Sequence, residues 1–298
     1  MIEAEQFEIS DSILVDIFKE LYYPNSCYEF SIVDPFIIGQ IYELFLEEEI
    51  VIKDGIVVAE RKPEIVDSQG VVNTPKNIAD IIVKTTLAPL FSDEKFTEWD
   101  SYRIADICCG SGNFLLSAYE FIINRYIEYY MKNSLDMAIQ KGLLISDVGN
   151  NFKLSYEKKR EILRNNIWGV DIDILAVEVA KFSLLIKLIE DSSLYEMESF
   201  AKTITVEFTY LDNNIKNGNS LVDEKCIEFN SNILNDPEMV EKIKIFNWEN
   251  EFAGEKFDAI VGNPPYIRVQ NMVHFLKMNM NIINLPFQNM KRKIRFIR

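Results

Sequence analysis

The spacing of hydrophobic residues in the first part of the chain predicts short helices and a hairpin. Apolar residues recur at helical spacing over 11–22 and again over 35–48, where a proline at the first helical position follows an aspartate suited to cap the helix. Two β-rich runs flank Asp54-Gly55, a dipeptide that favours a tight hairpin turn. These patterns predict an N-terminal helical region with a hairpin over residues 1–69.

Beyond this region the pattern alternates between helical and strand-like segments. The expected helices are residues 75–90, 113–131, 156–166 and 174–190. The expected strands are residues 102–107, 167–171, 203–209 and 257–262. The segment 132–155 is polar and poorly patterned, and we expect an insertion there. Strands that alternate with helices predict an α/β fold with a doubly wound parallel sheet.

The composition indicates a folded protein without a membrane span. The chain has 298 residues, of which 48% are hydrophobic and 26% are charged. No apolar run reaches about 18 residues, and the acidic start of the chain lacks the basic segment of a secretory signal. Four cysteines without C-x-x-C spacing and a single histidine argue against a metal site and against Ser-His-Asp catalysis. We therefore expect a cytoplasmic protein that binds no metal and no membrane.

The charge is acidic overall but changes sign near the end of the chain. The formal net charge is −16, which taken alone argues against nucleic-acid binding. The first 258 residues hold 24 basic and 47 acidic residues, whereas the last forty hold seven basic residues and no acidic one. We interpret residues 271–298 as a basic tail outside the catalytic core. The tail is explained either by a truncated or frame-shifted product or by contacts with DNA.

A glycine-rich loop follows the first expected strand of the alternating region. The residues from Asp106 to Phe114 read D-I-C-C-G-S-G-N-F and join a strand to a helix. Glycines let backbone N–H groups approach a ligand closely, and the helix N-terminus adds partial positive charge. Asp106 would bind an ammonium group, and the loop would bind a carboxylate. The spacing differs from the dinucleotide and P-loop signatures, which disfavours NAD and ATP, and a tight turn without a ligand stays an alternative.

An acidic residue, Asp171, ends the next expected strand. In open α/β sheets, ligands lie at the carboxyl ends of strands, and an acidic residue there is placed to hydrogen-bond ribose hydroxyls. The alternative is that Asp171 caps the following helix, although the neighbouring Asp173 is the better cap candidate.

The last expected strand leads directly into the sequence Asn263-Pro264-Pro265-Tyr266. Prolines fix φ and lack N–H donors, so the loop is stiff and presents carbonyl groups. The Asn263 side-chain oxygen and the Pro264 carbonyl would both accept hydrogen bonds from one NH₂ group, and Tyr266 offers a flat face for a ring. Two such acceptors would return the delocalised lone pair of a conjugated amine to its nitrogen. The loop therefore predicts chemistry at an amino group attached to a ring.

These motifs resemble those of the class I S-adenosylmethionine-dependent methyltransferases that modify exocyclic amino nitrogens. Their order resembles that of the γ-type N6-adenine DNA methyltransferases of restriction–modification systems, including type IIG and type I modification enzymes. The resemblance implies a Rossmann-like catalytic core over residues 70–270, with S-adenosylmethionine as cofactor. The residues that match the family's cofactor-binding positions are Thr74, Asp106, Cys108, Gly110, Gly112, Asp171 and Asn219. Those that match its catalytic positions are Asn263, Pro264, Pro265 and Tyr266.

The chain departs from the family pattern in three respects. Val72 and Asn73 precede Thr74, where the family usually has aromatic residues, and Asn219 stands where an aspartate is commoner. The family sheet has more strands than the chain is expected to supply, so the resemblance implies a core that is incomplete at its C-terminal end. It also implies that the domain that recognises DNA is missing. The expected partners are double-stranded DNA and a specificity subunit or second chain that completes the sheet.

The resemblance implies methyl transfer to N6 of an adenine flipped out of the duplex. Tyr266 would stack on the base while Asn263 and Pro264 hold its amino group. Asparagine before Pro-Pro favours adenine N6 over cytosine N4, and no cysteine follows a proline, as cytosine C5 methylation would require. Two alternatives stay open: methylation of a protein glutamine or an RNA amine, and a catalytically silent fragment that binds the cofactor.

Overall fold

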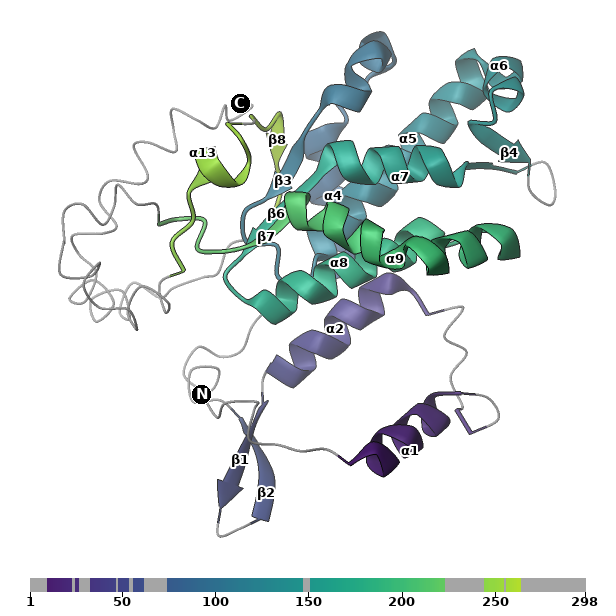
Figure 1. The fold of residues 1–298 in the computed structure, drawn as a ribbon. Helices are drawn as coiled ribbons and strands as arrows, with labels where there is room; N and C mark the ends of the chain where they lie inside the picture. Colours follow the sequence, from purple (N-terminus) through teal and green to yellow (C-terminus); the bar gives the residue numbers. More distant parts are fainter. Residues whose placement is uncertain are drawn as a thin grey trace.

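The computed structural model shows a parallel sheet with helices packed against it (Figure 1). It describes residues 10–22, 25–26, 33–46, 48–53, 56–61, 74–146, 151–222, 244–254 and 256–263. Within these ranges, no helix has the length and apolar character needed to cross a membrane.

The N-terminal region contains the two helices and the hairpin that the sequence predicts. Helix α1 spans Asp11–Leu21 and helix α2 spans Pro35–Leu46. Strands β1 (Glu48–Lys53) and β2 (Ile56–Arg61) pair antiparallel, and the predicted turn between them lies outside the described residues. Helix α2 packs on helix α8 (Ile174–Ile189), as Figure 1 shows. The N-terminal region therefore contacts the α/β part of the chain.

Four parallel strands form the central sheet in the order β7-β6-β3-β8. They are β3 (Ile104–Asp106), β6 (Ile167–Asp171), β7 (Ile215–Asn217) and β8 (Ala259–Ile260). The chain runs outward from β3 to β6 and β7 and then returns to the other side of β3. The reversal between β3 and β8 is a topological switch point, where open α/β sheets bind ligands beyond the carboxyl ends of their strands. The predicted α/β class with a parallel sheet is confirmed.

The prediction of a strand over 203–209 is wrong, because these residues lie in helix α9 (Leu194–Asn214). The segment is rich in β-branched residues, but a capping box between Ser193 and Glu196 starts the helix upstream. Threonine hydroxyls in the segment bond to carbonyl oxygens one turn earlier, which satisfies them inside the helix. The strand that takes this place in the sheet is β7, which begins directly after the helix.

The remaining described elements follow the predicted alternation closely. The helices are α4 (Lys76–Leu87), the 3-10 helix η3 (Asp93–Ser101), α5 (Asn113–Asn133), α7 (Tyr156–Asn166) and α13 (Trp248–Glu251). The expected insertion forms helix α6 (Leu135–Gln140) and a hairpin of β4 (Leu144–Ser146) and β5 (Phe152–Leu154). Helix η3 was not predicted, because its short polar sequence has no helical periodicity of apolar residues.

Side chains of β6 alternate between two hydrophobic cores. Ile167 belongs to the large cluster formed with the helices, and a Cβ on Gly169 would lie 2.8 Å from Leu115 of α5. Trp168 and Val170 instead pack with the aromatic residues in and around α13. Because successive residues of a strand point to opposite faces, the sheet is covered on both sides. Helices cover one face, and a smaller aromatic cluster covers the other.

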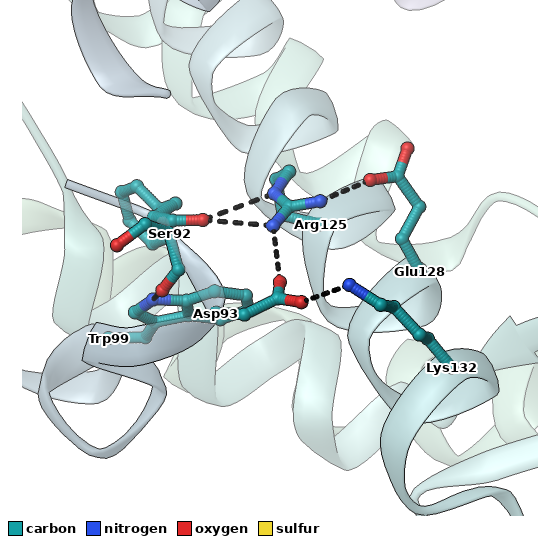
Figure 2. A network of polar contacts seen from close by, with 7 residues as sticks. Ser92, Asp93, Trp99, Arg125, Glu128 and Lys132 are labelled. Carbon is teal, nitrogen blue, oxygen red and sulfur yellow. Dashed lines mark hydrogen bonds and ion pairs between the residues drawn. The ribbon is translucent and has the colours of Figure 1, made fainter. Parts of the chain in front are cut away.

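A charged network ties η3 to α5 at the end of the sheet opposite the glycine loop. Arg125 lies roughly 18 Å along α5 from its start, at 1.5 Å per residue. Figure 2 shows its guanidinium between Glu128 and the backbone before η3. It donates to the Phe91 carbonyl and to Asp93, each at 3.0 Å, and Lys132 donates to the same carboxylate at 2.8 Å. Lys132 and Arg125 hold the pKa of Asp93 below its ordinary value.

Candidate functional site

The first predicted site residue, Asp106, ends β3 and is 1% exposed. One of its carboxylate oxygens accepts a hydrogen bond from the Cys108 N–H at 3.0 Å, which fixes the start of the loop. Burial raises the pKa of Asp106 to about 7, and the charge of Asp171 adds to the shift. In the part of the chain that the structure describes, no lysine or arginine pairs with this group. The loop therefore holds a buried carboxyl group without a cationic partner there.

The glycine loop that follows requires positive φ angles, which are unfavourable for residues with a side chain. Gly110 has φ +52° and Gly112 has φ +93°, both in the left-handed region. Gly112 precedes helix α5, and a Cβ there would lie 2.9 Å from the Cβ of Ala180 on α8. The loop thus combines a tight turn with a close approach of two helices. Both features favour glycine at the positions the sequence singles out.

Asp171 ends β6 and binds the glycine loop directly. It accepts hydrogen bonds from the Gly110 N–H at 2.7 Å and from the Asp173 N–H at 2.9 Å. The cap of α8 is Asp173, whose side chain accepts from the Leu175 N–H at 2.9 Å. The alternative that Asp171 caps the helix is therefore wrong. Burial raises the pKa of Asp171, although these backbone donors oppose the shift.

Asn263 lies just beyond β8, and its side chain reaches Thr74 in front of α4. The Asn263 Nδ2 donates to the Thr74 Oγ1 at 3.0 Å. Two residues far apart in the sequence, both predicted as site residues, are thus brought into contact. The bond assigns the amide nitrogen to Thr74 and leaves the amide oxygen as the acceptor. The other predicted catalytic residues, Pro264, Pro265 and Tyr266, lie outside the described residues.

Gly262 brings the ends of β8 and β3 together. A Cβ at this residue would lie 2.5 Å from the Asp106 Oδ1, so the backbone before Asn263 touches the buried carboxyl group. Its φ of +151° is also rare for residues with a side chain. Sequence reasoning missed this contact, and the available signal was a glycine between a strand and the Asn-Pro-Pro sequence. The loop with Asn263 and the glycine loop are therefore neighbours.

The segment after β7 joins the same edge of the sheet. The Gly218 N–H donates to the Asp171 carbonyl at 2.8 Å, and the Asn217 amide donates to the same carbonyl at 2.9 Å. The Asn219 side chain accepts from the Leu221 N–H at 3.1 Å and so forms a local turn. Asn219 follows the residue that bonds to the end of β6, and its match to a cofactor-binding position stays a prediction. The contact of Asn217 with Asp171 is one that the sequence did not indicate.

The ends of the strands thus gather groups suited to a charged ligand with hydroxyls. Asp106 fits a cationic group, Asp171 fits hydroxyl donors, and the amide oxygen of Asn263 fits an N–H donor. Groups of three or more histidine, cysteine or acidic residues arranged for a metal ion are absent from the described residues.

Comparison with known proteins connects this geometry to one group of enzymes. Residues 165–291 match the family model of the Eco57I restriction-modification methylase. The chain is also 34% identical over 282 residues to the type II restriction enzyme and methyltransferase RM.Eco57I of Escherichia coli. Over these residues the chain is similar to restriction–modification methylases. The matched range contains Asp171 and Asn263, and it extends into the basic segment at the end of the sequence.

A second methylase relative is the adenine-specific methyltransferase PglX of Streptomyces coelicolor, 23% identical over 214 residues. The two alignments cover 94% and 68% of this chain, so the similarity to RM.Eco57I includes most of the N-terminal region. The chain spans about a quarter of RM.Eco57I, 26% of its length, and 15% of PglX.

Proposed function

We propose that this chain carries the cofactor-binding and amine-binding motifs of an S-adenosylmethionine-dependent N6-adenine DNA methyltransferase of a restriction–modification system. The observation that carries the proposal is the contact between Gly262 and Asp106, which sets Asn263 beside the glycine loop. In-line transfer needs a donor and an amine acceptor held next to each other. The names of the relatives, a restriction enzyme and methyltransferase and an adenine-specific methyltransferase, support the same reaction class.

The residues present fit S-adenosylmethionine. When bound, this cofactor supplies an electrophilic methyl group on a sulfonium. Asp106 would hold the ammonium group, since it is buried and has no cationic partner among the described residues. An adjacent positive charge would also lower the raised pKa of this carboxyl group. Asp171 would bind the ribose hydroxyls from the neighbouring strand end.

The glycine loop would face the carboxylate of the same ligand. The N–H groups of Gly110 and Gly112 are already bonded, to Asp171 and to the Cys109 carbonyl. The attraction for the carboxylate would therefore come from the positive N-terminal end of α5, which favours an anion. Cys108 lies in this loop, and its N–H orients Asp106. We place Asn219 near the adenine of the cofactor because it follows β7, next to the end of β6.

The Asn263 amide would hold the target amine through its oxygen. Its nitrogen donates to Thr74, and in this orientation its oxygen is left to accept from the amine. This role for Thr74 adds to the cofactor contact that the family resemblance implies. The Pro264 carbonyl as second acceptor, the stiffness given by Pro265 and the stacking of Tyr266 stay predictions from the sequence. Two acceptors would localise the lone pair on nitrogen, so no strong base is required before transfer.

The strand order supports a Rossmann-like core of the class I methyltransferase type. Numbered along the chain, β7-β6-β3-β8 is the order 3-2-1-4, which opens the doubly wound 3-2-1-4-5-6 arrangement. The proposed ligand lies at the switch point of this order, between strands 1 and 4. In that arrangement, further strands add to the sheet beside β8.

Duplex DNA is the proposed substrate, and the target adenine must leave the base stack to reach Asn263. The chain carries a net charge of −16, which opposes binding to the DNA backbone. We therefore propose that another domain, a specificity subunit or a second chain supplies most of the DNA contacts.

Isothermal titration with S-adenosylmethionine tests the proposal. We expect the wild type to bind and Asp171→Ala to bind roughly 10- to 150-fold more weakly, because a hydrogen bond to a charged group contributes about 1.5–3 kcal/mol. Glu198→Ala, at an exposed position on α9, is the control, and circular dichroism checks that each variant folds. Equal heats from wild type and Asp171→Ala would remove Asp171 from the site, and absence of binding by the wild type would contradict the proposal.

A second assay follows labelled methyl groups into duplex DNA, RNA and protein. We expect weak incorporation into DNA by this chain alone, because its acidic charge disfavours the duplex. Strong incorporation into DNA would overturn that expectation while supporting the substrate class. Preferential labelling of RNA or of protein glutamine would instead support the alternative methyltransferase function.

A further inference from the structure

Helix α2 contacts both loops that form the proposed cofactor site. Two consecutive residues of this helix make the contacts. The Tyr42 hydroxyl donates to Asp173 Oδ2 at 2.8 Å in the loop after β6. The Ser111 hydroxyl, in the glycine loop after β3, donates to Glu43 Oε1 at 2.7 Å. A helix outside the sheet therefore connects two loops that belong to different strands.

The contact with the glycine loop is close and buried. Gly39 lies one turn before Glu43, and a Cβ there would lie 2.8 Å from the Ser111 Oγ. Ser111 is 1% exposed, and burial raises the pKa of Glu43. Gly39 lets the backbone of α2 approach the glycine loop. Glu43 accepts a hydrogen bond from the Ser111 hydroxyl of that loop.

The bond between Glu43 and Ser111 matters because it restricts a loop that contains two glycines. Ser111 stands between Gly110 and Gly112, two glycines in the left-handed region. Glycines lose more conformational freedom than other residues when they are fixed. A bond to the residue between them restricts the loop before a ligand arrives, and such preorganisation increases affinity by lowering the entropy cost of binding.

The contact with the second loop passes through Asp173 to Asp171. Asp173 accepts from Tyr42 with one oxygen and caps α8 with the other. Its N–H donates to Asp171 Oδ1 at 2.9 Å, and the other oxygen of Asp171 accepts from Gly110. Tyr42 therefore holds the residue that orients the proposed ribose-binding carboxylate.

We propose that Tyr42 and Glu43 are positioning residues that fix the two cofactor loops ahead of binding, with one residue acting on each loop. Tyr42 acts on the ribose-binding carboxylate, and Glu43 acts on the loop that faces the amino-acid part of the ligand. The inference rests on the proposed function, since it assigns these loops to S-adenosylmethionine. It goes further because it gives the N-terminal helix a part in cofactor binding.

The test uses two ligands that separate the loops. S-adenosylhomocysteine carries both the ribose and the amino-acid part, whereas adenosine carries only the ribose and base. We expect Tyr42→Phe to weaken both ligands by a similar factor of roughly three to ten, the value of one hydrogen bond. We expect Glu43→Leu, which removes the acceptor of the Ser111 hydroxyl, to weaken S-adenosylhomocysteine by a similar factor and adenosine by less than about twofold.

Matched controls lie on the exposed face of α9. Tyr195→Phe removes a hydroxyl from a residue that is 81% exposed, and Glu198→Leu removes one exposed carboxylate. Both should leave the affinities unchanged. Thermal unfolding of every variant identifies a general loss of stability, and Ser111→Ala breaks the Glu43 bond from its other partner if Glu43→Leu fails to fold.

The outcomes separate the inference from the proposed function. Failure of the wild type to bind S-adenosylhomocysteine would contradict the proposed function. Wild-type binding with unchanged affinities in both variants would overturn the role of the helix and leave the proposed function intact. Equal weakening of both ligands by Glu43→Leu, together with a lower unfolding temperature, would show a structural role only and also overturn the inference.

Discussion

Acidic side chains have cationic partners at one end of the central sheet and lack them at the other. At the amino end, Asp93 has two cations, Arg125 and Lys132, within 3.0 Å. At the carboxyl end, Asp106 and Asp171 accept hydrogen bonds from backbone N–H groups, and Asp106 also bonds to the Cys108 side chain, but neither has a cationic partner among the described residues. The first arrangement stabilises the fold by itself. The second leaves two acidic groups close together, and in the proposed function the ligand would supply the missing positive charge.

The difference has an energetic cost that only the carboxyl end bears. A buried carboxyl group without a cation is unfavourable in its charged form, which is why the pKa of Asp106 rises to about 7. Asp93 shows the opposite direction, since Lys132 and Arg125 lower its pKa. Perturbed acidic groups of the first kind are typical of functional sites. The comparison therefore predicts that neutralising charges at the two ends has opposite effects on stability.

The largest effect should follow from Asp106→Asn at the carboxyl end. The change keeps the shape of the side chain and removes its charge, so the ammonium group of S-adenosylmethionine loses its partner. We expect binding to weaken by about 2–3 kcal/mol, roughly 30- to 150-fold, as measured by isothermal titration. The ligand-free variant should nevertheless be at least as stable as the wild type at pH 8. If Asp106→Asn both bound more weakly and unfolded more easily, the carboxyl end of the sheet would serve stability as the amino end does, and the distinction between the two ends would be wrong.

A smaller effect, of the opposite kind, is expected for Arg125→Met at the amino end. The substitution leaves the Phe91 carbonyl and Asp93 without their shared donor. Because the Arg125 side chain is only 23% exposed, we expect the free energy of unfolding to fall by about 2 kcal/mol in urea titrations. The affinity for S-adenosylmethionine should stay within twofold of wild type, which separates a role in stability from a role in binding.

The pH dependence of unfolding gives a smaller difference per pH unit, and the most specific one. The pKa of Asp106 is about 7 in the folded chain against an ordinary value of 3.8, so the folded state holds this proton more tightly. Its contribution to the stability of the ligand-free chain is therefore present at low pH and lost as pH rises toward 7, by at most about 1.4 kcal/mol per pH unit. Asp106→Asn lacks this loss, so its stability relative to wild type should increase between pH 4 and 7 and then level off. A stability difference between Asp106→Asn and wild type that does not change with pH would contradict this explanation.

The parts of the fold that local sequence determines were predictable. Asp34 caps α2 through a 3.0 Å bond from the Phe36 N–H, as an aspartate before proline suggests. Helix α7 and strand β6 begin and end where their apolar patterns do. The third strand was misplaced because the β-branched residues over 203–209 favour a strand locally. The capping box of Ser193 and Glu196 lies about ten residues upstream, outside that segment, and together with tertiary packing it favours a helix instead.

In the candidate site, too, the residues that follow a strand could be predicted, whereas the contacts between distant segments could not. The glycine loop and Asp171 were predictable because each follows a recognisable strand. The contacts that assemble the site were not, because they join residues far apart in the chain. The Tyr42 bond spans 131 positions, and the Asn263 bond to Thr74 spans 189. Strand order decides which of these segments meet, and a single sequence does not contain the strand order.

Gly262 affects the spacing between the two segments that would take part in the proposed reaction. Its missing side chain lets two strand ends touch, so no flexible group separates the segment holding the donor from the segment holding the acceptor. Even a methyl group there would act as a wedge between them. The spacing between these two segments is therefore set by backbone contact, and in the proposed reaction the target base would have to leave the duplex to meet it.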